Sequence, residues 1–205
     1  MSGTLYSLGT EPMQDITQLI STFQMYGITV VFDVRNQYEI RRTPGLGKME
    51  LRELCPLCGI RYVDAADGFS MDNVERKFLH SRGYVNFEKY IESLSFKTKI
   101  DSVKDYLRYQ GNVCLLGYRE TVPLCHRFYI ASELLKAGFD TLHIGPGMPQ
   151  PHSVLEQKEV DSAFPELDQV PLFPVAKEPY ESKLTKTLVM LNKEIGENWV
   201  RGGAS

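Results

Sequence analysis

The sequence has few cysteines, no long apolar run and no strong net charge, and each shortage excludes a class of protein. No segment approaches the roughly 18 apolar residues that a membrane helix needs, and residues 1–20 lack the cationic start and apolar core of a signal peptide. Four cysteines without a secretory signal favour reduced thiols over disulfides. We therefore expect a cytoplasmic protein with no membrane partner.

Recognisable cofactor and metal motifs are also missing. Neither a Walker sequence nor a GxGxxG occurs, and the "GPG" at 145–147 is too short for a phosphate loop. Cys55 and Cys58 form a CxxC, but no second pair of zinc ligands follows at similar spacing. We interpret them as two semi-buried thiols near a helix end and expect no metal and no cofactor.

The formal charge of -3 gives the chain no overall attraction to nucleic acid or to an anionic membrane, so any basic site must be local. At 205 residues the chain is long enough for one well-packed domain with an appendage. Short β-branched and aromatic runs alternate with segments of helical periodicity. This alternation predicts an α/β fold with a mainly parallel open sheet of about five strands and helices on both faces. The expected strands are 4–8, 28–34, 60–65, 112–118 and 140–144.

The last third of the chain differs in composition, because seven of the eleven prolines fall between residues 146 and 179. We expect an α/β core over residues 1–145 and a proline-rich extension, mostly without regular structure, over 146–181. Leucines at three- and four-residue steps predict a final helix at about 182–197, within a 182–205 segment that docks on the core.

Ligands of open parallel sheets bind beyond the carboxyl ends of the strands. Just after the fourth expected strand, Cys125, His126 and Arg127 stand at the beginning of a helix. A thiol at a helix start beside two cations has its thiolate stabilised. Either Cys125 is a nucleophile, or the helix start is a phosphate or carboxylate cradle in which Cys125 only fills space. The third reading is a small core residue beside an ordinary ion pair.

A second cluster follows the second expected strand. Asp33 and Arg35 end the strand, and Arg41, Arg42 and Lys48 follow on the connection. Placed at the same sheet edge as Arg127, these cations predict a small positive pocket for a phosphate-bearing ligand. Asp33 either orients an arginine, which we favour, or takes a proton.

The histidines after the last expected strand have different expected roles. His152 follows a turn and could reach the same edge, whereas His143, inside the strand, reads as a structural histidine.

Several segments together resemble a bacterial and archaeal family, the domain of unknown function 488, over roughly residues 4–155. They include "VVFDVRNQYEIRRTPGLGK", "RGYVNFEKYIES", "VCLLGY" and "LCHRFYIASELLKAG". The resemblance implies an α/β domain and brings no settled reaction. The positions that match the family are Asp33, Arg35, Arg41, Arg42, Lys48, Tyr84, Cys125, His126, Arg127 and His152.

The chain departs from the family at two strand ends. Gly9-Thr10 stands where members commonly have Gly-His, and Gly117-Tyr118-Arg119 stands where they have Cys-Ala-Glu. Arg119 therefore replaces an acid with a cation, which strengthens anion binding and weakens the expectation of family-type catalysis. We include Thr10 and Arg119 among the expected binding residues.

Three hypotheses remain open. The first is an enzyme of group transfer or hydrolysis on a phosphate-containing, nucleotide or nucleic-acid-related substrate, with Cys125, His126 and Asp33 as catalytic candidates. The second is a non-catalytic module that binds a nucleotide or a nucleic-acid end. The third is a purely structural network of arginines and aspartates. The oligomeric state is not predicted.

Overall fold

A computed structural model describes residues 3–69, 74–79, 85–123, 125–163 and 179–202. It is an α/β structure with a six-stranded sheet in the order β3-β2-β4-β1-β5-β6. The first five strands in that order are parallel, and β6 pairs antiparallel with β5. The strands are β1 (Leu5–Gly9), β2 (Ile28–Asp33), β3 (Arg61–Asp64), β4 (Asn112–Gly117), β5 (Thr141–Ile144) and β6 (Gln150–Pro151).

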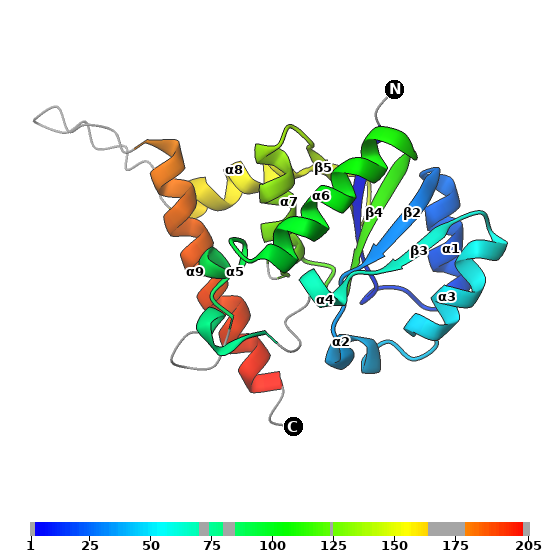
Figure 1. The fold of residues 1–205 in the computed structure, drawn as a ribbon. Coiled ribbons are helices and arrows are strands. Elements are labelled where there is room, and N and C mark those ends of the chain that lie inside the picture. Colours follow the sequence, from blue (N-terminus) through cyan, green and yellow to red (C-terminus); the bar gives the residue numbers. More distant parts are fainter. Residues whose placement is uncertain (1–2, 70–73, 80–84, 124, 164–178, 203–205) are drawn as a thin grey trace, which may run out of the picture.

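The helices connect these strands and then extend beyond the sheet (Figure 1). In chain order they are α1 (Ile16–Met25), α2 (Gln37–Arg41), α3 (Lys48–Leu57), α4 (Ala66–Phe69), the 3-10 turn η1 (Arg76–Phe78), α5 (Phe87–Tyr90), α6 (Leu94–Tyr109), α7 (Arg127–Lys136), α8 (His152–Ala163) and α9 (Tyr180–Gly202).

Local sequence explains where several helices begin. Asp15 caps α1 by accepting from the backbone N–H of Gln18, and Gly27 follows with a φ of 59° that suits glycine. Asn36 and Glu39 form a reciprocal capping box at the start of α2. These caps position the chain just after β2, where the predicted cations lie.

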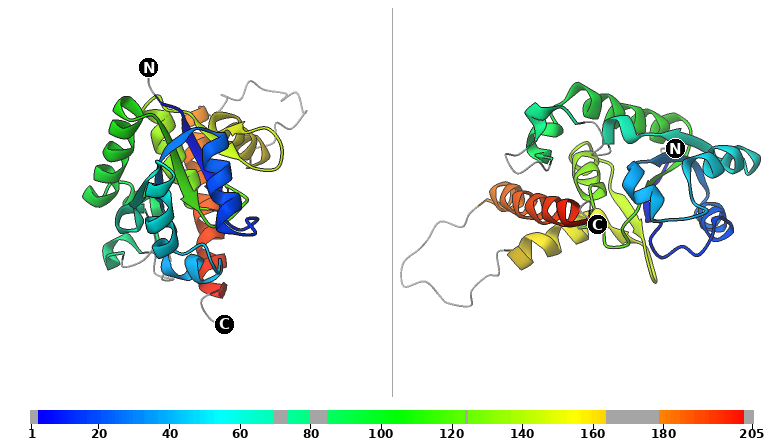
Figure 2. Two further views of the ribbon diagram at one scale, coloured as in Figure 1. Left: turned by 90° about the vertical axis from the view of Figure 1, so that its right-hand side faces the viewer. Right: turned by 90° about the horizontal axis from the view of Figure 1, so that it is seen from below.

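Helices cover both faces of the sheet, as predicted (Figure 2). On one face, apolar residues of α1 and α3 pack on the outward side chains of β1, β2 and β4. On the other face, α6 and α7 pack on the alternate residues of the same strands. The two layers bury the sheet from both sides, which explains why β2 and β4 are nearly all apolar.

Between η1 and α6 the chain forms only the short helix α5, before Ser93 caps the longer α6. Helix α7 begins at Arg127, with His126 at its N-cap position, so the Cys125-His126-Arg127 triplet lies at a helix start. The structure differs from the expectation in the segment after β5, which was expected to have little regular structure. The proline-rich extension contains β6 and the 12-residue helix α8, because its prolines stand before and after this helix rather than inside it.

The final helix lies against the rest of the molecule. Leu184 and Leu191 of α9 are buried, and the hydroxyl of Tyr129 on α7 donates to the carbonyl of Leu188. Helix α9 lies beside α8 in both views of Figure 2. Within the part of the chain that the structure describes, no helix has both the length and the apolarity to cross a membrane.

Candidate functional site

The parallel register brings three strand ends together at the centre of the sheet. Gly9 of β1 pairs with Gly117 of β4, and Asp33 of β2 pairs with Leu116 on the other side of β4. The start of α7 reaches these ends, because Nε2 of His126 bonds the carbonyl of Val34 just after β2 and Nη1 of Arg127 donates to Ser7 of β1. These strand ends and the start of α7 therefore lie at one edge of the sheet.

Cys125 lies between two cationic side chains. Its Sγ is 3.3 Å from Nε of Arg127 and 3.9 Å from Nδ1 of His126. Burial in itself raises the pKa of Cys125, but the charges of Arg127 and His126 outweigh it and hold this pKa at about 5. The thiol is 2% exposed. Cys125 is therefore a buried thiolate at neutral pH.

His126 is the proton-bearing partner of that thiolate. Its Nε2 donates to the backbone carbonyl of Val34 at 2.8 Å, which leaves Nδ1 facing the sulfur of Cys125. Burial lowers the pKa of His126, but the negative charges of Cys125 and Glu39 raise it to about 9. The pair is thus a thiolate and an imidazolium at neutral pH.

Arg127 is held by three acceptors, and all of them belong to the protein. Besides the contact with Cys125, its Nη1 donates to Oγ of Ser7 at 2.8 Å and its Nη2 donates to the carbonyl of Arg119. The side chain is 1% exposed. Its charge therefore acts on the thiolate, and its donors do not face solvent.

Glu39 and Asn36 complete the surroundings of His126, and neither was among the predicted site residues. Glu39 is 8% exposed. Burial raises its pKa by more than the charge of His126 lowers it, so the pKa of Glu39 is raised overall. Asn36 accepts the backbone N–H of Glu39 through Oδ1, and its Nδ2 has no hydrogen-bond partner among the described residues. The Asn-x-x-Glu spacing after β2 is a sequence signal for the capping box of α2, but it does not indicate that these residues lie near His126.

Asp33 and Arg35 form a second buried pair at this edge. The carboxylate accepts from Nε of Arg35 at 2.9 Å and from Nη2 at 2.7 Å, and Nη1 donates to Oγ1 of Thr43 at 3.3 Å. The hydroxyl of Tyr62 adds a further bond to Asp33 at 2.8 Å. Both charged side chains are 0% exposed. The two hydrogen bonds from Arg35 to Asp33 fit the orienting role that we predicted for Asp33.

The exposed cations form a rim outside the buried pairs. Arg42 stacks between Tyr38 and Tyr118, with its Cζ 5.4 and 5.6 Å from the two ring centroids. Arg119 stacks on Tyr118 at 5.5 Å and forms an ion pair with Glu11 at 3.3 Å. Arg41, at the end of α2, is exposed. The two tyrosines were not predicted, although both belong to the quoted motifs.

Other predicted residues lie elsewhere or are already engaged. Thr10 is buried and donates from Oγ1 to the carbonyl of Gly117 at 3.2 Å. Lys48 is paired with Asp64 at 2.7 Å, beyond β3. His152 is fully buried among residues of α7, α8 and β5 and does not join the edge. Tyr84 lies outside the described residues.

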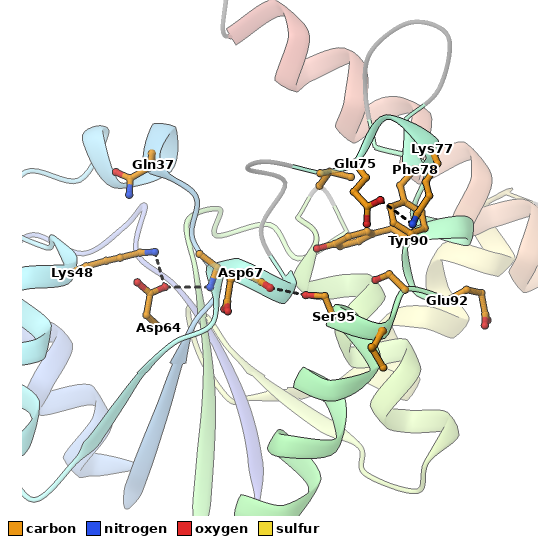
Figure 3. Close-up of a pocket in the computed structure, with 14 residues that line it drawn as sticks. Gln37, Lys48, Asp64, Asp67, Glu75, Lys77, Phe78, Tyr90, Glu92 and Ser95 are labelled. Carbon is orange, nitrogen blue, oxygen red and sulfur yellow. Dashed lines mark hydrogen bonds and ion pairs between the residues drawn. The ribbon is translucent and has the colours of Figure 1, made fainter.

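A cavity of about 900 Å³ opens beyond β3 and is shown in Figure 3. Lys48 and Asp64 point toward each other on one side, and Lys77, Phe78 and Tyr90 lie on the opposite side. Its lining has more acids than bases and includes none of Cys125, His126 and Arg127. We therefore do not assign the predicted phosphate-binding site to this cavity. Among the described residues, no cluster of acidic, histidine and cysteine side chains could hold a metal ion.

Fold and site define an α/β protein with a thiolate–imidazolium pair at the start of a helix. A family model described as "Domain of unknown function DUF488" matches residues 15–134. The chain belongs to this family, as the sequence resemblance indicated. Comparison with curated proteins and comparison with solved structures each found no match.

Proposed function

We propose that the protein is a cysteine-dependent enzyme that transfers or hydrolyses a group on a phosphate-bearing, nucleotide or nucleic-acid-related substrate. The observation that carries the proposal is the position of Cys125 Sγ, 3.3 Å from Arg127 Nε and 3.9 Å from His126 Nδ1. A low thiol pKa at a helix start is the state in which cysteine acts as a nucleophile.

The chemistry needs only groups that this pair supplies, together with water. The thiolate of Cys125 attacks phosphorus and forms an S–P bond, while the bond from phosphorus to the leaving oxygen breaks. The leaving oxygen takes the proton from Nδ1 of His126. Water then gives a proton to the neutral Nδ1 and attacks phosphorus, the S–P bond breaks, and the thiolate and imidazolium are restored. An acceptor hydroxyl in place of water makes the same sequence a transfer.

Support for an anionic substrate comes from the rim and from one buried donor. Arg41 and Arg42 are exposed, and Arg119, which follows β4, is half-buried. Arg42 and Arg119 both lie over the ring of Tyr118. The unpartnered Nδ2 of Asn36 could donate to a substrate oxygen. The buried Arg35 and Arg127 have protein acceptors instead. We therefore propose that the cations of the rim bind the negative charge of the substrate, and that Arg127 stabilises the thiolate.

A second candidate function is a non-catalytic module that binds the same anion. The 2% exposure of Cys125 favours it, because a substrate reaches Sγ only after the surrounding chain moves.

We also propose that the protein works in the cytoplasm, where reducing conditions keep its free cysteines as thiols.

Alkylation as a function of pH tests the thiolate. In a Cys58→Ser background, which removes the exposed thiol, iodoacetamide labelling of Cys125 is followed by mass spectrometry. The expected midpoint is at about pH 5. Cys114 is the internal control, because burial raises its pKa to about 12. Labelling of Cys125 that rises only in the ordinary thiol range, near pH 8.5, would remove the nucleophile from the proposal.

Turnover separates the enzyme from the binding module. With p-nitrophenyl phosphate as a generic probe and a set of nucleotides, the enzyme predicts product that Cys125→Ser abolishes without loss of ligand-dependent thermal stabilisation. The binding module predicts the same stabilisation, its loss in Arg42→Gln, and no product. Full activity of Cys125→Ser on any substrate found would contradict the covalent mechanism.

A further inference from the structure

A second buried polar network includes Ser132 in the middle of α7 and plays no part in the thiolate site. It links Ser132 of α7, His152 and Glu156 of α8, and His143 of β5, all between 0% and 5% exposed. Oγ of Ser132 is 2.7 Å from Oε2 of Glu156 and 2.9 Å from Nε2 of His152. Nδ1 of His152 is 3.0 Å from Nε2 of His143. This series of hydrogen bonds thus ends at His143.

The direction of these hydrogen bonds follows from the single proton of the serine hydroxyl. Burial raises the pKa of Glu156, but hydrogen bonds from His152 and Ser132 lower it overall, so the carboxylate accepts the Ser132 proton. Ser132 then accepts from Nε2–H of His152. Nδ1 of His152 and Nε2 of His143 share the remaining hydrogen bond, in which one nitrogen donates and the other accepts.

Nδ1 of His143 is buried and lacks a hydrogen-bond partner within the described part of the chain. An unsatisfied buried polar atom costs about 1–3 kcal/mol. Burial and the charges of His152 and Arg127 hold the pKa of His143 well below its ordinary value, so the imidazole does not gain a second proton at neutral pH. A ligand hydroxyl, which can donate or accept a hydrogen bond, would satisfy this nitrogen.

His143 lines a cavity of about 230 Å³, between the loop 120–123 and the segment 144–150. Liquid water occupies about 30 Å³ per molecule, so this volume has room for a small ring. The lining contains no lysine and no arginine, and its one acid, Glu120, is exposed. Its other members are Thr121, Val122, Pro123, Ile144, Gly145, Pro146, Met148, Gln150 and Leu155.

This mixture of apolar and uncharged polar groups suits a neutral hydroxylated ring and does not suit a phosphate. The loop 120–123 also leads directly to Cys125, so the cavity adjoins the chain that carries the nucleophile. We propose that the cavity is a subsite for the sugar part, a pentose, of the substrate, with Nδ1 of His143 forming a hydrogen bond with a sugar hydroxyl. This inference rests on the proposed function for the identity of the whole substrate.

Side-chain nitrogen resonances test the contact directly. The full chain is labelled with ¹⁵N-histidine, and the two nitrogens of His143 are assigned by comparison with His143→Gln. Titration with D-ribose is expected to shift the Nδ1 resonance of His143 and to saturate. Ribose 5-phosphate is expected to do the same at lower concentration, and inorganic phosphate is expected to leave it unchanged.

Two matched variants separate the cavity from an effect elsewhere. Leu155→Trp fills the cavity and should abolish the ribose-dependent shift, whereas Val154→Trp, at an exposed neighbour outside the lining, should retain it. Circular dichroism checks that both variants fold. No shift in the wild-type protein with either sugar, or a shift that survives Leu155→Trp, overturns the inference.

The outcome is independent of the thiolate test. A low pKa of Cys125 without a response of His143 removes only the sugar subsite. A response of His143 without a thiolate at Cys125 removes the proposed enzyme and leaves a sugar-binding protein.

Discussion

The side chain of Arg127 passes directly over Gly117: a Cβ built on Gly117 would lie 2.4 Å from Nε and 2.5 Å from Cδ of the arginine. Non-bonded atoms do not approach a Cβ this closely, so the path of the Arg127 side chain to Cys125 requires that residue 117 has no side chain. Gly117 is also the position at which the family resemblance implies cysteine. The departure from the family pattern and the position of this buried guanidinium are therefore linked.

Replacing Gly117 should disturb the thiolate. In Gly117→Ala, the new methyl group displaces Arg127 and weakens its contact with Sγ. We expect the alkylation midpoint of Cys125 to rise by about one pH unit, because an opposite charge within about 4–6 Å shifts a pKa by 1–3 units. Gly145→Ala is the control, since a Cβ there meets nothing within 4 Å. An unchanged midpoint in Gly117→Ala would show that Arg127 does not set the thiol pKa.

The His126 imidazolium should give the stability of the protein a pH window. The pKa of His126 is raised to about 9, so its contribution is lost as pH rises through that value. The pKa of Cys125 is lowered to about 5, so its contribution is lost as pH falls through that value. Between these limits both charges are present. The difference in Tm between wild type and His126→Gln should be largest there, and a difference independent of pH would contradict the ion pair.

Glu39 should act on His126 through its charge. In Glu39→Gln, the side-chain amide oxygen can still accept from the N–H of Asn36, so the cap of α2 is retained. The negative charge that raises the pKa of His126 is lost. We expect the high-pH titration of His126, followed by ¹⁵N resonances, to move to lower pH. Glu53→Gln, on the exposed side of α3, should leave it in place.

The strands and most helices could be predicted because their signals are local. Strands β2 and β4 could be predicted from their nearly all-apolar runs, which reflect the cover on both of their faces. Helix α8 was missed because prolines dominate the segment around it. Proline before a helix is compatible with its start, and composition alone does not separate that arrangement from a loop.

Residue partners at the site could not be predicted, because they depend on contacts that are distant in sequence. The signals for Arg35 and Arg127 were their positions at strand ends and a helix start. That each would be fully buried depends on Thr43, on Ser7 and on the carbonyl of Arg119. Ser7 is 120 residues from Arg127 in the chain. The sequence places Asp33 and Arg35 at a strand end and Arg127 at a helix start, and contacts distant in the chain decide which of their side chains face solvent.

The Asp33–Arg35 pair should be required for the stability of the fold. In Asp33→Asn, Arg35 keeps its charge in a fully buried position without its carboxylate, and the hydroxyl of Tyr62 loses a charged acceptor. Breaking a buried ion pair on one side costs about 3–5 kcal/mol, so we expect a loss of this size in urea unfolding. Asp101→Asn breaks the exposed pair with Lys104 and should cost at most about 1 kcal/mol. If Asp33→Asn unfolds like wild type, Asp33 does not serve to orient Arg35, and a role in proton transfer becomes the better assignment, since such a role makes no demand on stability.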